Sequence, residues 1–91
     1  MGTEAINLDI LKNKIKEFDK KAGWDKTEFK ELIDYMQEEL DNLKSSPDNR
    51  DRVNHLLADL LVLIMQVSYR YDTDFDSELE NWFRETEKYT K

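Results

Sequence analysis

Three acidic side chains occupy positions where carboxylates could act together. Asp59 interrupts the apolar run from Leu56 to Met65, where a carboxylate must be paired, hydrogen-bonded or bound to a metal ion. Glu38 and Glu39 lie on the preceding predicted helix, and helical periodicity places Glu39 at the edge of its apolar face. An antiparallel pairing of the two helices would bring Asp59 against Glu39. Facing carboxylates repel unless they are protonated or bridged by a cation, and oxygen ligands of this kind suit Mg²⁺ or Mn²⁺.

Other interpretations of these residues stay open. Asp59 could form an ordinary ion pair with Arg52 or with a lysine from another helix. Two adjacent glutamates are also typical of a helix surface that faces solvent. His55 is the one histidine of the chain, and we expect it at the surface or at an interface more than as a metal ligand.

The elements that must position these acids are helices. The chain has 91 residues with two Gly, one Pro and no Cys, so it lacks both the turn residues of a sandwich or barrel and the cysteines of a disulfide scaffold. The composition predicts an all-α fold, a four-helix bundle in one domain over residues 1–91. Because 38% of the residues are charged, the predicted core is thin, and a thin core is often completed by oligomerisation.

Apolar periodicity and turn residues place the four helices. Their approximate predicted bounds are Leu8–Ala22, Lys26–Lys44, Asp51–Tyr71 and Asp76–Tyr89. The clearest loop is Ser45–Asn49, between the second and third helices.

Local signals predict how these helices begin and end. Gly23 is a predicted stop for the first helix. Asp25 with Glu28 has the spacing of a capping box for the second helix. Ser77 with Glu80 has the same spacing before the fourth, where Phe75 could act as a hydrophobic staple.

The third helix is apolar on more than one face. An ordinary core stripe, which includes Leu57 and Ile64, lies within about 60° of Leu60 on the helical wheel. A second apolar group lies about 100° to 200° away and consists of Ala58, Leu61, Val62 and Met65. We expect this second group to form a self-association interface in a dimer or tetramer. The alternative is that the helix is central in its own bundle.

The charge of the chain restricts its partners. A net charge of −7 and an isoelectric point near 4.7 disfavour nucleic-acid polymers and anionic membranes, which repel an acidic surface. Small anionic ligands remain possible if a metal ion bridges them. The longest apolar run, Leu60–Met65, is far shorter than a membrane span, and the start of the chain shows no signal segment, so we expect a cytoplasmic protein.

The order of these features resembles a known family. Phe18 and the Gly23-Trp24 pair precede a helix with Glu38-Glu39, and a loop then leads to an apolar helix with Asp59. From about Phe18 onward, this order is similar to that of the MazG-like, all-α nucleoside triphosphate pyrophosphohydrolases.

The resemblance implies a function and a set of site residues. In that family, acidic residues hold Mg²⁺ on the phosphates of a nucleotide, and water attack releases pyrophosphate and a nucleoside monophosphate. Glu38, Glu39 and Asp59 correspond to metal-binding acids, with Mg²⁺ (or Mn²⁺) as the cofactor. Trp24 matches the entry aromatic of the pattern, and with Tyr35 it would flank a nucleoside triphosphate substrate.

Two alternatives accompany this expectation. Asn42 and Leu56 stand where the family pattern has glutamates. The chain could therefore be a catalytically impaired nucleotide-binding or regulatory relative. It could also be a helical protein-interaction module whose acids face solvent.

Overall fold

The computed structural model describes residues 7–90, and all regular structure in that part of the chain is helical. The four helices are α1 (Leu8–Ala22), α2 (Phe29–Lys44), α3 (Arg50–Arg70) and α4 (Phe75–Thr86). Two short 3-10 turns, η1 (Trp24–Lys26) and η2 (Glu87–Tyr89), follow α1 and α4. The prediction of an all-α fold with four helices is confirmed.

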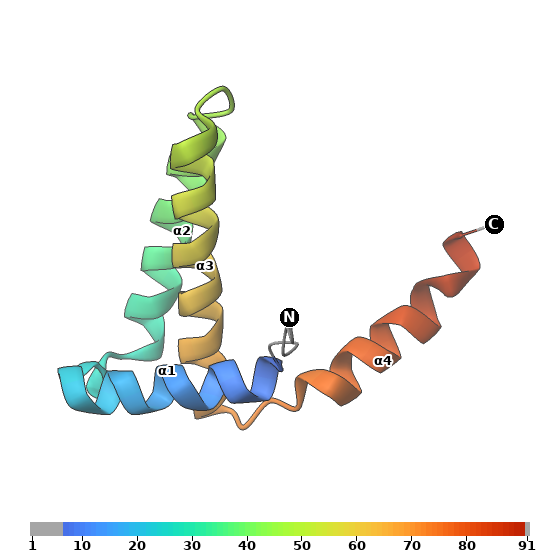
Figure 1. The fold of residues 1–91 in the computed structure, drawn as a ribbon, viewed down its shortest axis with the longest axis horizontal. Helices are drawn as coiled ribbons and strands as arrows, with labels where there is room; N and C mark the ends of the chain where they lie inside the picture. Colours follow the sequence, from blue (N-terminus) through green and yellow to red (C-terminus); the bar gives the residue numbers. More distant parts are fainter. Residues whose placement is uncertain (1–6, 91) are drawn as a thin grey trace, which may run out of the picture.

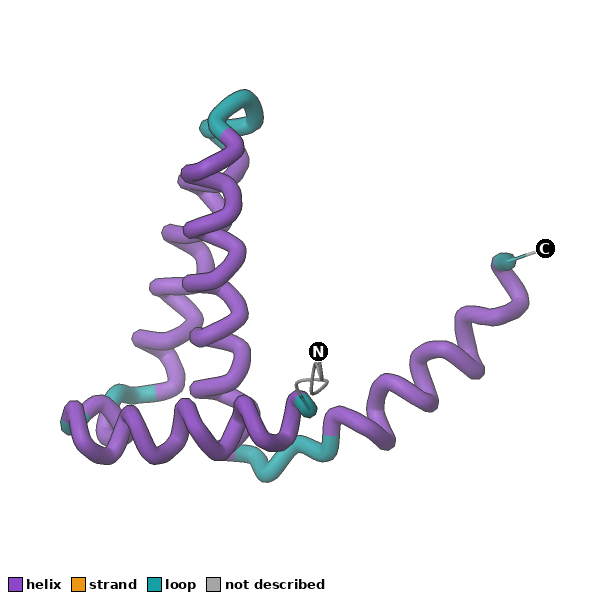
Figure 2. The backbone as a smooth tube through the Cα atoms, in the orientation of Figure 1, coloured by secondary structure: helices purple, strands orange, loops and turns teal. Residues whose placement is uncertain are grey.

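The helices are arranged around an antiparallel hairpin of α2 and α3. Figure 1 shows α1 lying across one end of this hairpin, where it packs on α3, and α4 leading away from the hairpin. The tube in Figure 2 follows the same path and shows the loop at the far end of the hairpin. Within the described residues, α4 packs only lightly on the rest of the chain, against α1.

The first and third helices begin and end close to where the sequence predicts. Gly23 ends α1 with φ of 78°, a left-handed conformation that glycine adopts without steric cost. Asn49 caps α3, because its side-chain oxygen accepts a hydrogen bond from the Arg52 backbone N–H at 3.1 Å.

Both predicted capping boxes are wrong. Asp25 belongs to η1, and Glu28 is itself the N-cap of α2, without a side-chain capping hydrogen bond. At α4 the cap is Asp74, whose carboxylate accepts from the Ser77 N–H at 3.2 Å. Because Asp74 is a strong N-cap, α4 begins earlier than predicted and Phe75 is its first residue instead of a staple before it.

The apolar core of the described chain is small. Its fully buried apolar side chains are Leu32, Leu56 and Met65. Met65 is only 1% exposed because α1 crosses this end of α3, so its predicted place on an outer interface is wrong. Conversely, Leu57 and Ile64 are exposed, although periodicity predicts them in the core stripe.

The remaining predicted interface residues stay on the surface. Ala58, Leu61 and Val62 are all exposed on α3. No helix within residues 7–90 combines the length and apolar character needed to cross a membrane.

Candidate functional site

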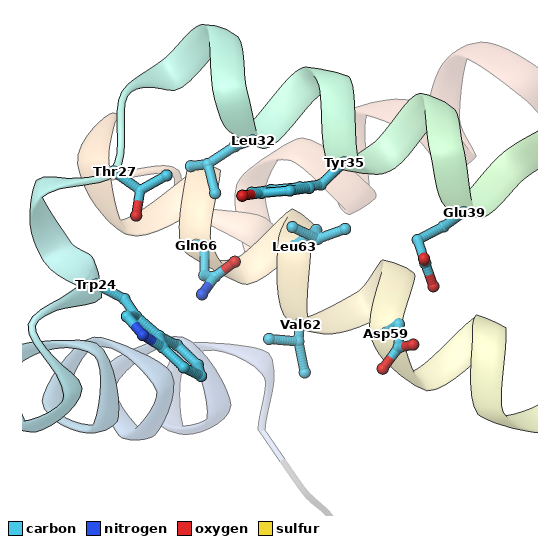
Figure 3. Close-up of a pocket in the computed structure, with 9 residues that line it drawn as sticks. All are labelled: Trp24, Thr27, Leu32, Tyr35, Glu39, Asp59, Val62, Leu63 and Gln66. Carbon is cyan, nitrogen blue, oxygen red and sulfur yellow. The ribbon is translucent and has the colours of Figure 1, made fainter.

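A pocket of about 490 Å³ lies between α2, α3 and η1. Figure 3 shows its lining side chains, which are Trp24, Thr27, Leu32, Tyr35, Glu39, Asp59, Val62, Leu63 and Gln66. Four of the five residues predicted to hold a metal or a substrate therefore line one cavity.

Glu39 and Asp59 form one end of this pocket. The antiparallel packing of α2 and α3 brings them together, as Figure 3 shows. Burial raises the pKa of Glu39 above its usual value, and the neighbouring Asp59 carboxylate raises it further. Glu38 adds a smaller repulsion, while His55 lowers the pKa of Glu39. The negative form of Glu39 is thus disfavoured without a cation beside it.

The surroundings of Glu39 fit a divalent cation. Its Oε2 atom is buried and has no hydrogen-bond partner among residues 7–90. An unpaired buried carboxylate oxygen is costly, and either a proton on the carboxylate or a hard cation held together with Asp59 would satisfy it. The donor set is made of oxygens alone, which suits Mg²⁺ or Mn²⁺.

Asp59 has one ionic partner in the described chain. Its Oδ2 atom lies 3.3 Å from Nε2 of His55, one turn earlier on α3. The open alternative of a pair with Arg52 or a lysine is not the arrangement found. The His55 side chain is 74% exposed, so solvent screens this pair and the charge of Asp59 remains available to a ligand.

Glu38 lies outside the pocket. It is adjacent to Glu39 on α2, and residues one position apart point about 100° away from each other on a helix. Its side chain is exposed and does not line the cavity. Its negative charge nevertheless repels that of Glu39 weakly and so raises the pKa of Glu39.

Two aromatic side chains line the rest of the pocket. Trp24 is 51% exposed and Tyr35 is 50% exposed, so each keeps free ring surface. Phe18 supports Trp24 in an edge-on contact with ring centroids 5.5 Å apart. Arg70 fixes the backbone here, because its guanidinium donates hydrogen bonds to the carbonyl oxygens of Thr27 and Trp24.

Behind the pocket lies a buried polar group that the sequence analysis missed. Asp19 on α1 is 1% exposed and accepts hydrogen bonds from Gln66 Nε2 at 3.0 Å and from the Tyr69 hydroxyl at 2.6 Å. Burial and the contact with Asp19 raise the pKa of Tyr69 to about 12. The one available signal was Gln66, a polar residue on an apolar helix that needed a partner.

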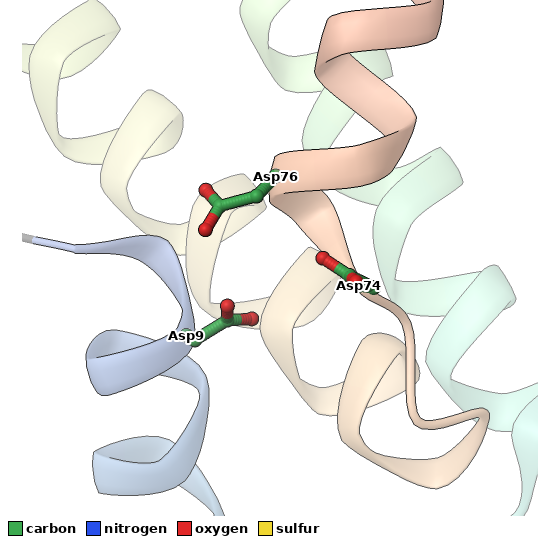
Figure 4. Close-up of side chains that lie close together, drawn as sticks. All are labelled: Asp9, Asp74 and Asp76. Atoms are coloured by element: carbon green, nitrogen blue, oxygen red, sulfur yellow. The ribbon is translucent and has the colours of Figure 1, made fainter.

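A second group of acids has a structural explanation. Asp9, Asp74 and Asp76 lie together at the first turns of α1 and α4, as Figure 4 shows. The pKa of Asp74 is lowered by hydrogen bonds from Ser77, first from its backbone N–H and then from its side chain. Lys12 forms an ion pair in this group, with its Nζ atom 3.4 Å from Oδ1 of Asp9. Helix capping and the helix dipole account for these acids.

Comparison with known proteins does not assign a family. No family model, no curated protein and no solved structure matches the chain.

Proposed function

We propose that the chain is a Mg²⁺-dependent nucleoside triphosphate pyrophosphohydrolase of the MazG-like type. The observation that carries the proposal is the pocket, which has a facing pair of carboxylates at one end and two half-exposed aromatic rings along it. A Mg²⁺–nucleotide has the matching parts, a cation with phosphates and a planar base.

The acidic end of the pocket would bind the phosphates through a cation. Glu39 and Asp59 would hold the cation, with the buried Oε2 of Glu39 as one ligand atom. Mg²⁺ bound there would neutralise phosphate oxygens that the acidic chain otherwise repels.

The aromatic rings of the pocket would stack on the base. Stacking on an aromatic side chain is worth about 1–3 kcal/mol per base and needs a free ring face. Trp24 and Tyr35 both line the pocket with half of their surface exposed. Phe18 and the Arg70 hydrogen bonds hold Trp24 in place without covering that surface.

Pyrophosphate release tests this function. The protein is mixed with a panel of ribo- and deoxynucleoside triphosphates in Mg²⁺ or Mn²⁺, and pyrophosphate is measured. We expect release by the wild type and a loss of about 10²-fold or more in Asp59→Asn, because this substitution removes a charge from the cation site. Glu38→Gln is the matched control, with near wild-type release expected because Glu38 lies outside the pocket. Equal rates for the wild type and Asp59→Asn would refute the proposal.

A second candidate function is nucleotide binding without catalysis. It is favoured by the position of Glu38, since two carboxylates line the pocket where the sequence pattern suggested three. Such a protein would show a higher melting temperature with Mg²⁺ and a nucleotide, because a ligand that binds the folded form stabilises it, but no pyrophosphate release. The absence of any melting shift would instead favour the protein-interaction alternative.

We also propose that a second copy of the chain covers the exposed apolar surface. Three buried apolar residues make a weak core for a domain of this size, whereas α3 exposes Leu57, Leu61 and Ile64. On α4, the apolar side chains Leu79, Trp82 and Phe83 are exposed as well. An isolated helix as short as α4 is marginal in water and gains stability mainly from packing.

Light scattering tests this association. The wild type should run as a dimer or tetramer, and Leu61→Asp should lower the measured mass because it buries an unpaired charge at the interface. Leu40→Asp is the control, because Leu40 is exposed on α2, outside the apolar surfaces of α3 and α4, and this variant should not change the mass. A monomeric wild type at micromolar concentration would contradict the proposal.

A further inference from the structure

The inner part of the pocket contains a polar side chain that the proposed reaction does not use. Gln66 is only 6% exposed, yet it lines the pocket with Trp24 and Tyr35. In the view of Figure 3 its amide lies between these two rings, at the opposite end of the pocket from Glu39 and Asp59. A base that stacks there would present its edge to this amide.

Asp19 fixes which atom of the amide faces the pocket. A carboxylate offers acceptors alone, so the Gln66 atom 3.0 Å from Asp19 Oδ1 must be the nitrogen. The other carboxylate oxygen accepts from the Tyr69 hydroxyl, and with its pKa raised to about 12 Tyr69 keeps that proton at neutral pH. The Tyr69 hydroxyl thus fixes the Asp19 carboxylate, and the Gln66 amide cannot turn its nitrogen away from Asp19 without losing a buried hydrogen bond.

The amide oxygen of Gln66 is consequently available to a ligand. It accepts no hydrogen bond from any residue between 7 and 90. Figure 3 shows this oxygen turned toward the side of Leu63, away from the nitrogen that binds Asp19. The hydroxyls of Thr27 and Tyr35 also line the pocket, but a hydroxyl can donate or accept and does not fix the sense of a hydrogen bond.

We infer that Gln66, oriented by Asp19, makes the pocket select bases that carry an amino group where their counterparts carry a keto oxygen, adenine over hypoxanthine and cytosine over uracil. This inference rests on the proposed function. An amino group would donate to the fixed Gln66 oxygen. A keto oxygen in the same place would face the Gln66 oxygen. Both atoms are acceptors, so neither would receive a hydrogen bond. Buried polar groups left unpaired in this way are a strong source of discrimination.

Two substrate pairs that differ by one group measure the selection. ATP is compared with ITP, and CTP with UTP, by kcat/KM for pyrophosphate release. The product monophosphates of each pair are compared by calorimetric dissociation constants in Mg²⁺, a readout that does not require catalysis. We expect the amino member of each pair to be favoured by about tenfold or more, the effect of one good hydrogen bond.

Two variants separate the roles of Gln66 and Asp19. Gln66→Met keeps an unbranched side chain without the oxygen and should bring both ratios close to one. Asp19→Asn keeps the shape of Asp19 but adds a donor, so the Gln66 amide can turn its nitrogen to the pocket, and the amino preference should fall or invert. A residue that acted only on stability would change all four affinities equally.

The outcomes distinguish the two proposals. Equal affinities within both pairs in the wild type, with nucleotides bound, would overturn the selection by Gln66 and leave the proposed function standing. Failure of every nucleotide to bind or react would overturn both. If Asp19→Asn does not fold, judged by its circular dichroism, the wild-type pairs and Gln66→Met still decide the question.

Discussion

Asp19 and Glu39 are two acids near opposite ends of one pocket, and their surroundings differ. Asp19 receives two hydrogen bonds from its own chain, from Gln66 and Tyr69. Glu39 has a buried oxygen without a partner in the described residues, and it faces a second carboxylate, Asp59. Its pKa is raised by burial and by these like charges. A polar group that serves the fold has its partners within the fold, whereas Glu39 has the properties of a group that meets a ligand.

The strongest test of this difference is Asp19→Ala. It leaves the Gln66 amide and the Tyr69 hydroxyl buried without their acceptor, which costs about 3 kcal/mol of unfolding free energy. Urea unfolding at fixed protein concentration measures this loss. A loss below about 1 kcal/mol would show that water replaces the carboxylate, and that Asp19 does not stabilise the fold as described.

A smaller effect is expected from Tyr69→Phe, which removes one hydrogen bond to Asp19 and about 1 kcal/mol of stability at neutral pH. Because the pKa of Tyr69 is raised to about 12 from an ordinary 10.0, its contribution is present below pH 10 and is lost as the pH rises through 12. The stability difference between wild type and Tyr69→Phe should therefore shrink in that range. A constant difference from pH 9 to 12 would contradict the assignment.

Substitution of Glu39 should raise the unfolding free energy, in contrast to the losses expected at Asp19 and Tyr69. Glu39→Gln removes a charge that Asp59 repels, so without a divalent cation the variant should be more stable at neutral pH by roughly 0.5 kcal/mol. The raised pKa of Glu39 means that wild-type stability falls as the pH rises above the ordinary value of 4.5 and through the raised value. The advantage of the variant should hence appear in the same range.

Glu38→Gln controls for the general loss of one negative charge. It should gain less stability than Glu39→Gln, because Glu38 is exposed. Addition of Mg²⁺ should raise the melting temperature of the wild type and of Glu38→Gln, and should leave Glu39→Gln nearly unchanged. An equal response of all three proteins would remove Glu39 from the cation site.

The smallest effect should come from His55→Ala. The pair with Asp59 is exposed, so its loss should change the unfolding free energy by no more than about 0.5 kcal/mol at pH 7. If His55 instead supplied a ligand to the cation, the variant would lose the Mg²⁺-dependent rise in melting temperature. Retention of that rise in His55→Ala supports a site made of Glu39 and Asp59.

Local sequence signals predicted the helices well where the signal was unambiguous. The bounds of α1 agree with the prediction because Gly23 adopts a conformation that other residues avoid. The start of α4 was predicted to within one residue, but its cap was misassigned because two capping residues, Asp74 and Ser77, compete within one turn of sequence. At α2, Asp25 does not cap the helix because it is part of the 3-10 turn Trp24–Lys26.

Pairs distant in sequence were harder to predict. Glu39 and Asp59 were found because each lies at the edge of an apolar stripe and the loop between their helices makes an antiparallel hairpin. Asp19 was missed because nothing in its lysine-rich surroundings marks it as buried, and its partners lie 47 and 50 residues away. Met65 was misplaced because periodicity does not reveal that α1 crosses that end of α3.

The hydrogen bonds of Arg70 have a consequence for how this pocket can change in evolution. Arg70 holds the chain before α2 through carbonyl oxygens of the main chain at positions 24 and 27. Every amino acid has such a carbonyl, so the anchor does not depend on which side chain occurs at position 24. A substitution at Trp24 would therefore alter the ring offered to a ligand while the hydrogen bonds from Arg70 to the backbone remain.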